Sequence, residues 1–195
     1  RRLRGWTAHA VVGHDDLARA KEAALSDGAA VVTEGLARVR ERIARAASTA
    51  GRDPAEVRLV AVSKKKPAAA IREAYAAGQR DFGENYAQEL AQKSEELAEL
   101  SDLRWHFIGH LQSNKARLVV GTACMIHAVD GPALARELGK RAAGDARGVG
   151  AARLQVLVEV NVGGEAQKHG ATAAQLSEVL DAIDAEAALE LRGLM

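Results

Sequence analysis

The chain has 195 residues, 48% of them hydrophobic, and it carries 27 basic against 26 acidic side chains. This length suits one domain with a large core, and the net charge of +1 gives no field that attracts nucleic acid. No apolar run approaches the roughly 20 residues of a membrane helix, so we expect no membrane partner either. The single cysteine, Cys124, allows no disulfide within the chain and is typical of a reducing, cytoplasmic setting.

The first 30 residues form an N-terminal extension of uncertain order. They begin with the basic stretch "RRLRGWTAHAVVG", and the acidic "DD" follows too soon for the apolar core of a signal peptide. From residue 31 to 50 the apolar side chains recur with helical spacing, and Gly51 ends this predicted helix. The folded domain is therefore predicted to cover residues 31–195.

Strands and helices then alternate along the chain. Strands are predicted at residues 57–64, 80–84, 104–110, 124–130, 154–162 and 189–195. Helices are predicted between them at residues 67–78, 85–100, 113–121, 132–144 and 172–186. Strict alternation of this kind indicates an α/β fold, with a parallel sheet covered by helices.

Two architectures fit this order, an open doubly wound sheet and a closed (βα)8 TIM-type barrel. We favour the barrel because polar residues recur at the end of each strand, as at a barrel mouth: Lys64, Glu84 with Asn85, His110, Asp130 and Asn161. A barrel needs eight strands and only six are predicted here. Either the open sheet is right, or the chain is a C-terminally incomplete barrel lacking the last two strands, which is the interpretation that we adopt.

The segment "LVAVSKKKP" places three consecutive lysines at the end of the first predicted strand. Side chains alternate along a strand, so Lys64 shares the face of Val60 and Val62. Lys66 precedes a proline, which pushes it out of the strand, and Lys64 is therefore the most plausible inward lysine. Its amine could form a Schiff base with an aldehyde. A solvated turn is the simpler alternative on spacing alone.

Four motifs occur in order: "LVAVSKKKP", "FGENYAQE", "WHFIGHLQSNK" and "VEVNVGGEAQKHG". Together they resemble the pyridoxal phosphate homeostasis protein family, which is similar to the N-terminal barrel of alanine racemase. The resemblance covers residues 36 to 195. It implies that Lys64 holds pyridoxal 5′-phosphate (PLP) as a Schiff base. The family usually reads Ser-Lys-Thr-Lys-Pro, so Lys65 departs from its pattern.

The resemblance also implies that Asn85 lies beside the cofactor and that Ile108 helps to form the floor under the pyridine ring. Asn85 alternatively caps the next helix, because asparagine is a favoured N-cap. His106 and His110 lie four apart on a predicted strand, where that spacing does not suit a metal ion, so no metal site is expected.

The predicted function is that of a monomeric carrier, which buffers PLP in the cytoplasm and passes it to PLP-dependent apoenzymes without substrate turnover. The alternative is a fold-type-III PLP enzyme such as an amino-acid racemase. Such an enzyme needs a second acid or base across the cofactor, and both tyrosines, Tyr75 and Tyr86, fall in predicted helices. The resemblance places the phosphate-binding loops after strands seven and eight, beyond the six strands predicted here.

Overall fold

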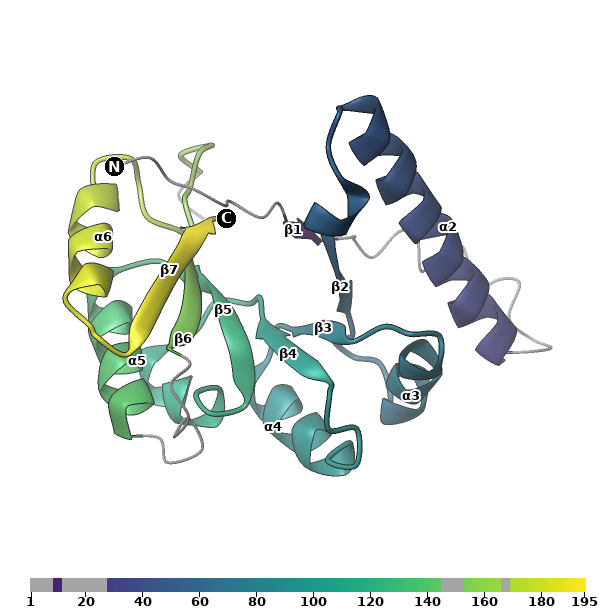
Figure 1. Cartoon of the computed structure of the whole chain (residues 1–195). Coiled ribbons are helices and arrows are strands. Elements are labelled where there is room, and N and C mark those ends of the chain that lie inside the picture. The colour runs from purple at the N-terminus through teal and green to yellow at the C-terminus, as the bar shows by residue number, and fades with distance from the viewer. Residues whose placement is uncertain (1–8, 12–27, 145–152, 166–168) are drawn as a thin grey trace. The chain divides into compact units, whose positions relative to one another are not determined.

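The structure is a computed structural model that describes residues 9–11, 28–144, 153–165 and 169–195 (Figure 1). It divides the chain into two compact units. The first unit is Arg1–Gly83 with Glu99–Leu103, and the second is Glu84–Ala98 with Arg104–Met195.

The first unit contains three parallel strands whose spatial order follows the chain. Its elements are β1 (His9–Val11), α2 (Gly28–Thr49), a 3-10 helix (Pro54–Glu56), β2 (Arg58–Val62), α3 (Ala68–Ala76) and β3 (Asp81–Glu84). The last residue of β3, Glu84, already belongs to the second unit. Strand β1 lies in the N-terminal extension and was not predicted; it pairs with β2 from His9 to Val11.

A buried glutamine, Gln79, joins the helices and strands of this unit. Its amide nitrogen donates to the carbonyl oxygens of Leu59 and Asp81, both at 2.7 Å. Arg40 of α2 donates to Gln79 Oε1 at 3.1 Å and to the carbonyl oxygen of Ala77 at 2.9 Å. Because a buried amide is costly unless it is hydrogen-bonded, this network stabilises the packing of α2 and α3 against the start of β2 and β3.

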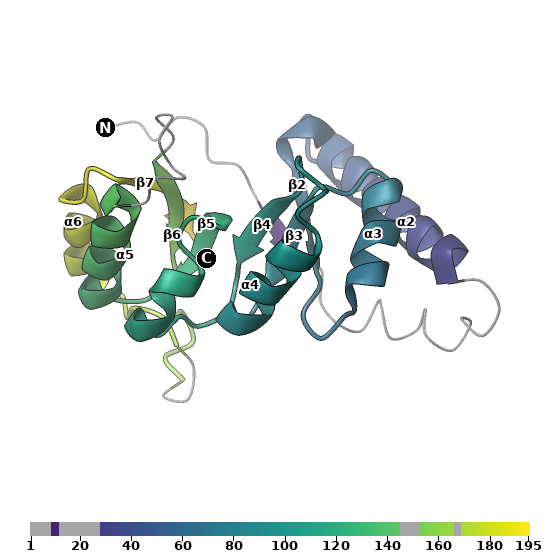
Figure 2. The same ribbon diagram turned by 90° about the horizontal axis from the view of Figure 1, so that it is seen from below.

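The second unit contains four more parallel strands, again adjacent in chain order. Its elements are α4 (Ala87–Glu96), β4 (Arg104–Phe107), a 3-10 helix (Ser113–Leu118), β5 (Ala123–Val129), α5 (Pro132–Gly144), β6 (Leu154–Val158), α6 (Leu176–Asp184) and β7 (Leu189–Leu194). Both views show α5 and α6 side by side along β5, β6 and β7 (Figures 1 and 2). The core between the helices and the sheet is aliphatic, with buried Ile126, Val156, Leu138, Val179 and Ile183.

The predicted alternation of strands and helices is confirmed from β2 to β7. The pairings β2–β3, β4–β5, β5–β6 and β6–β7 are parallel. The predicted helix over residues 113–121 is a 3-10 helix that ends at Leu118. The predicted strand over residues 154–162 ends earlier, at Val158. The domain boundary at residue 30 stays a prediction. Helix α2 begins two residues before it, at Gly28.

Within the described ranges, no helix combines the length and the apolar character needed to cross a bilayer.

Candidate functional site

Lys64 lies in a tight turn directly after β2. Ser63 is buried, and its N–H donates to the carbonyl oxygen of Gly83 at the end of β3, at 3.0 Å. The N–H of Lys66 then donates back to the carbonyl oxygen of Ser63 at 3.0 Å, which closes the turn around Lys64 and Lys65. The Lys64 side chain is half-buried whereas Lys65 is exposed. The turn therefore fixes Lys64 at the carboxyl end of β2, beside the matching end of β3.

The backbone of this turn is unusual at Lys65. Its φ angle is +58°, and among the described residues it is the one non-glycine residue with a positive φ. A positive φ at the third position is the signature of a type II turn, which normally takes glycine or asparagine there. Such backbone conformations cost free energy and cluster at functional sites.

Asn85 and Ile108 come together at the carboxyl ends of β3 and β4. The N–H of Ile108 donates to the carbonyl oxygen of Glu84 at 2.9 Å, next to Asn85. The side-chain oxygen of Asn85, Oδ1, is buried and has no hydrogen-bond partner among the described residues. The N-cap of α4 is Tyr86, and no side chain caps that helix. The capping role considered for Asn85 is therefore wrong, and its side-chain oxygen remains available for another partner.

Gly109 brings the two strand ends into close contact. A Cβ atom added to this glycine would lie 2.3 Å from the backbone oxygen of Asn85 and 2.7 Å from its Cα. Real Cβ atoms do not approach backbone this closely, so only glycine fits. Gly109, which follows the predicted floor residue Ile108, therefore lies directly against Asn85.

Glu84 turns away from this group. Its side chain is fully buried and pairs with Lys93 of α4 at 2.7 Å, and Lys93 also contacts Glu89 at 2.7 Å. The sequence interpretation placed Glu84 with Asn85 among the polar residues of the mouth. That placement is corrected for Glu84, because its carboxylate packs against a helix and joins β3 to α4.

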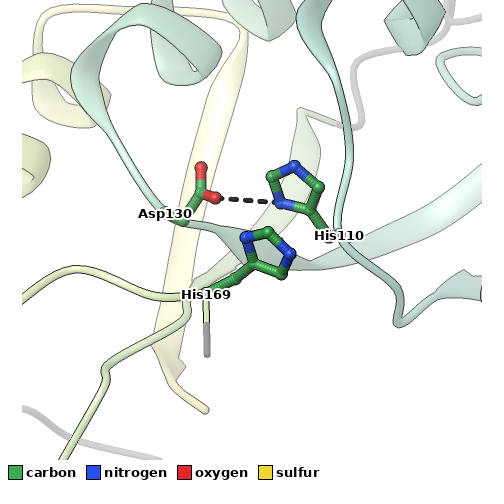
Figure 3. Close-up of side chains that lie close together, drawn as sticks. All are labelled: His110, Asp130 and His169. Carbon is green, nitrogen blue, oxygen red and sulfur yellow. Dashed lines mark ion pairs between the residues drawn. The ribbon is translucent and has the colours of Figure 1, made fainter. Parts of the chain in front are cut away.

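A second polar group lies at the ends of β4, β5 and the segment after β6 (Figure 3). His110 Nδ1 is 3.1 Å from Asp130 Oδ2, and the His110 and His169 rings stack with centroids 3.7 Å apart and planes 8° apart. His110 and Asp130 were recognised as strand-end residues, but His169 was not singled out. It lies in an irregular segment 39 positions after Asp130 in sequence, where no periodicity marks it.

Glu159 follows β6, and its carboxyl group interacts electrostatically with His110, Asp130 and His169. Burial raises the pKa of the Glu159 carboxyl, and the neighbouring charge of Asp130 raises it further, while His169 and His110 lower it. Its Oε2 atom is buried and has no hydrogen-bond partner among the described residues. Two carboxyl groups and two imidazoles therefore interact at this end of the sheet.

His106 belongs to a different environment from His110. It is buried, and its Nδ1 lies 2.9 Å from Nε2 of His127, while its Nε2 lies 3.7 Å from the Cys124 sulfur. The structure therefore separates the two histidines of "WHFIGH". Cys124 is exposed rather than a core residue, contrary to the usual behaviour of cysteine.

Comparison with known proteins shows the domain class to which the fold belongs. Residues 35–195 match the family model described as the alanine racemase N-terminal domain. The alanine racemase structure from Corynebacterium glutamicum superimposes with a TM-score of 0.57 at 18% identity, over 86% of this chain and 43% of that one. At this identity the likeness concerns the fold alone, and it supports the α/β barrel with six of its strands in β2 to β7.

Closer relatives define the family within that class. A pyridoxal phosphate homeostasis protein from Pseudomonas aeruginosa is 49% identical over 164 residues, which cover 84% of this chain and 69% of the relative. Its counterpart from Escherichia coli is 45% identical over 166 residues, with the same coverage of 84% and 69%. The chain belongs to the pyridoxal phosphate homeostasis protein family.

Two solved structures extend this comparison. PipY from Synechococcus elongatus, solved with PLP bound, superimposes with a TM-score of 0.65 at 43% identity, over 78% of this chain and 68% of that one. A protein of unknown function from Bifidobacterium adolescentis superimposes with a TM-score of 0.75 at 35% identity, over 98% of this chain and 74% of that one.

Proposed function

We propose that this chain holds PLP through the amine of Lys64, with Asn85 and Ile108 beside the cofactor, and buffers this reactive aldehyde in the cytoplasm. In this proposal the protein is a monomer that passes PLP to PLP-dependent apoenzymes and turns over no substrate. The observation that carries the proposal is the buried Asn85 Oδ1, which lacks a hydrogen-bond partner among the described residues. The PLP-bound PipY structure, at 43% identity, supports the choice of ligand.

The residues present fit this cofactor. A buried amide oxygen without a partner costs about 1–3 kcal/mol, and a donor such as the pyridoxal hydroxyl or an ordered water removes that cost. Gly109 lets the backbone after β4 approach the Asn85 backbone closely, which a residue with a Cβ atom could not do. Lys64, Asn85 and Ile108 each follow the carboxyl end of a parallel strand, where barrel proteins place their ligands.

The chemistry of PLP at this position is that of an aldehyde, which condenses with a primary amine. Lys64 supplies that amine from a turn whose backbone is fixed by two hydrogen bonds, so the side chain starts from a defined point. Lys65 and Lys66 add positive charge next to it, which attracts an anionic ligand. Asn85 orients the ring through its amide, and Ile108 provides an apolar surface and excludes water.

A carrier function is favoured over turnover by the surroundings of the tyrosines. The Tyr75 hydroxyl donates to Asp102, and the Arg80 guanidinium lies 3.9 Å above the Tyr75 ring. Tyr86 is exposed at the N-cap of α4. Tyr75 is thus engaged in a surface network, which supports the proposal that it does not act as the second acid or base of a racemase.

Absorption spectroscopy tests the proposal. Titration of the chain with PLP is expected to produce a new band near the visible edge, and Lys64→Arg is expected to abolish it, because a guanidinium does not condense with the aldehyde. Lys65→Arg is the matched control and keeps the band. A band that survives in Lys64→Arg contradicts the assignment, and steady turnover of a D- or L-amino acid contradicts the carrier function.

A further inference from the structure

We propose that His110, Asp130 and His169 form a binding site for a divalent transition-metal ion of the zinc class. This inference is independent of the proposed PLP site, because none of the three residues is assigned to the cofactor. Figure 3 shows the three side chains pointing toward one another from separate segments of the second unit.

The spacing of the donor atoms suits a small cation. One ligand atom from each of the three residues can be chosen so that all of them lie within 4.8 Å of one another. A tetrahedral zinc ion has metal–ligand bonds of about 2.0–2.2 Å, which places its ligands roughly 3.4 Å apart. The His110–Asp130 pair, at 3.1 Å, already meets this spacing. An imidazole nitrogen binds a metal ion in the plane of its ring, so the exposed His169 ring must turn out of its parallel stack with His110. Its ligand atom then has at most about 1.4 Å to move to reach this spacing.

The backbone around the three residues is held in place. His110 follows β4 and Asp130 follows β5, so each is anchored by a buried strand. The segment with His169 is tied back by the Ala171 N–H, which donates to the Glu159 carbonyl oxygen at 2.7 Å. The Asn161 N–H in turn donates to the Ala171 carbonyl oxygen at 2.9 Å. Ligands on a fixed backbone pay little ordering cost when the ion binds.

The donor set selects the class of metal. Two imidazoles and one carboxylate suit zinc, cobalt, nickel or ferrous iron, whereas calcium and magnesium prefer sites built from oxygen alone. Three protein ligands leave a fourth position for a solvent molecule, as in zinc sites that remain open. Asp130 is 21% exposed and His110 is 36% exposed, so an ion can reach the site from solvent.

The surroundings favour a cation. Glu159 follows β6, and its Oε2 atom is buried and has no hydrogen-bond partner among the described residues. A dication bound to Asp130 would attract this buried carboxylate as well, since opposite charges attract strongly away from solvent. Glu159 is therefore an outer carboxylate of the site, outside the set of three ligands.

Cobalt titration of the full chain tests the inference, both with and without PLP. Co²⁺ is expected to bind with one-to-one stoichiometry, to give visible absorption bands, and to be displaced by Zn²⁺. His110→Gln and His169→Gln are each expected to weaken binding at least about tenfold, as loss of a ligand should do at least as much as loss of an outer-shell partner. Glu178→Gln on α6 removes an exposed carboxylate elsewhere and is expected to leave binding unchanged.

Two results would overturn the inference. One is the absence of any saturable Co²⁺ or Zn²⁺ binding in the wild-type chain whose circular dichroism is that of a folded protein. The other is binding that persists at wild-type strength in the His110→Gln, His169→Gln double variant, which would assign the ion to other groups. A PLP band that is unchanged in these variants would show that the metal site and the cofactor site are separate.

Discussion

At the scale of single residues, the proposed PLP site depends most on Asn85, whose buried side-chain oxygen has no hydrogen-bond partner among the described residues. Asn85→Ala is expected to weaken PLP binding about tenfold, since the hydrogen bond to a buried polar group is worth roughly 1–3 kcal/mol. The folded chain without PLP should lose little stability, because the substitution removes an oxygen that has no partner in the described residues. Spectral titration gives the affinity and urea unfolding gives the stability.

The control for this prediction is Gln112→Ala, an exposed amide that precedes the 3-10 helix after β4. It is expected to change neither quantity. If Asn85→Ala binds PLP as tightly as the wild type does, the amide does not contact the cofactor.

The positive φ of Lys65 predicts a second effect. Lys65→Gly is expected to keep or raise the free energy of unfolding by up to about 1 kcal/mol, because glycine adopts a φ of +58° without strain. The neighbouring change Lys66→Gly has no such strain to relieve and should cost about 0.5–1 kcal/mol. Urea unfolding of the two variants measures the difference, and equal losses in both would argue against strain at Lys65.

At the scale of elements, the ion pair between Lys93 and Glu84 joins α4 to β3. Lys93→Ala leaves the Glu84 carboxylate buried without its closest cation, and such losses typically cost about 3–5 kcal/mol. Gln92→Ala, on the exposed side of the same helix, should stay within about 0.5 kcal/mol of the wild type. Chemical unfolding measures both variants. A loss of less than about 1 kcal/mol in the free energy of unfolding of Lys93→Ala would show that the ion pair contributes little to stability.

The elements themselves were largely predictable from sequence. Short valine-rich runs such as residues 154–158 and helices with regular apolar spacing carry their own signals. The alternation of the two then implies parallel pairing. The exceptions are instructive: β1 is a strand of three residues whose pairing with β2 depends on contacts distant in sequence, and Glu84 could be assigned a direction only after the position of Lys93 was known.

The site was predictable to a different degree. Strand alternation and the following proline distinguish Lys64 from the other two lysines, and its role as the PLP-binding amine stays a prediction. His169 could not be chosen, since nothing in "EAQKHG" indicates that its ring stacks on His110. Contacts between loops depend on the path of each loop in space, and a single sequence does not encode that path in any local pattern.

At the scale of the whole molecule, a surface network predicts how stability depends on pH. Hydrogen bonds from Tyr75 and then Arg80 hold the pKa of the Asp102 carboxyl below its usual range. A carboxyl whose pKa is lowered on folding stabilises the protein above its unfolded pKa, and this stabilisation is lost as the pH falls through the folded value. Asp102→Asn should therefore lower stability at neutral pH and make progressively less difference below about pH 4.

Thermal unfolding of the wild type and Asp102→Asn between neutral and acidic pH measures this convergence. Glu95→Gln, an exposed carboxylate on α4, serves as the control and should track the wild type throughout. A gap between wild type and Asp102→Asn that stays constant with pH would mean that the Asp102 charge does not contribute.

The proposed function depends on one bond, formed between the Lys64 amine and the PLP aldehyde. Borohydride reduction of the PLP-loaded chain, followed by proteolysis and mass spectrometry of the peptides, locates that bond directly. The expected result is the reduced cofactor mass on Lys64 alone, with Lys65, Lys66 and the other lysines unmodified. Label found mainly on another lysine, or spread evenly over all of them, would contradict the account.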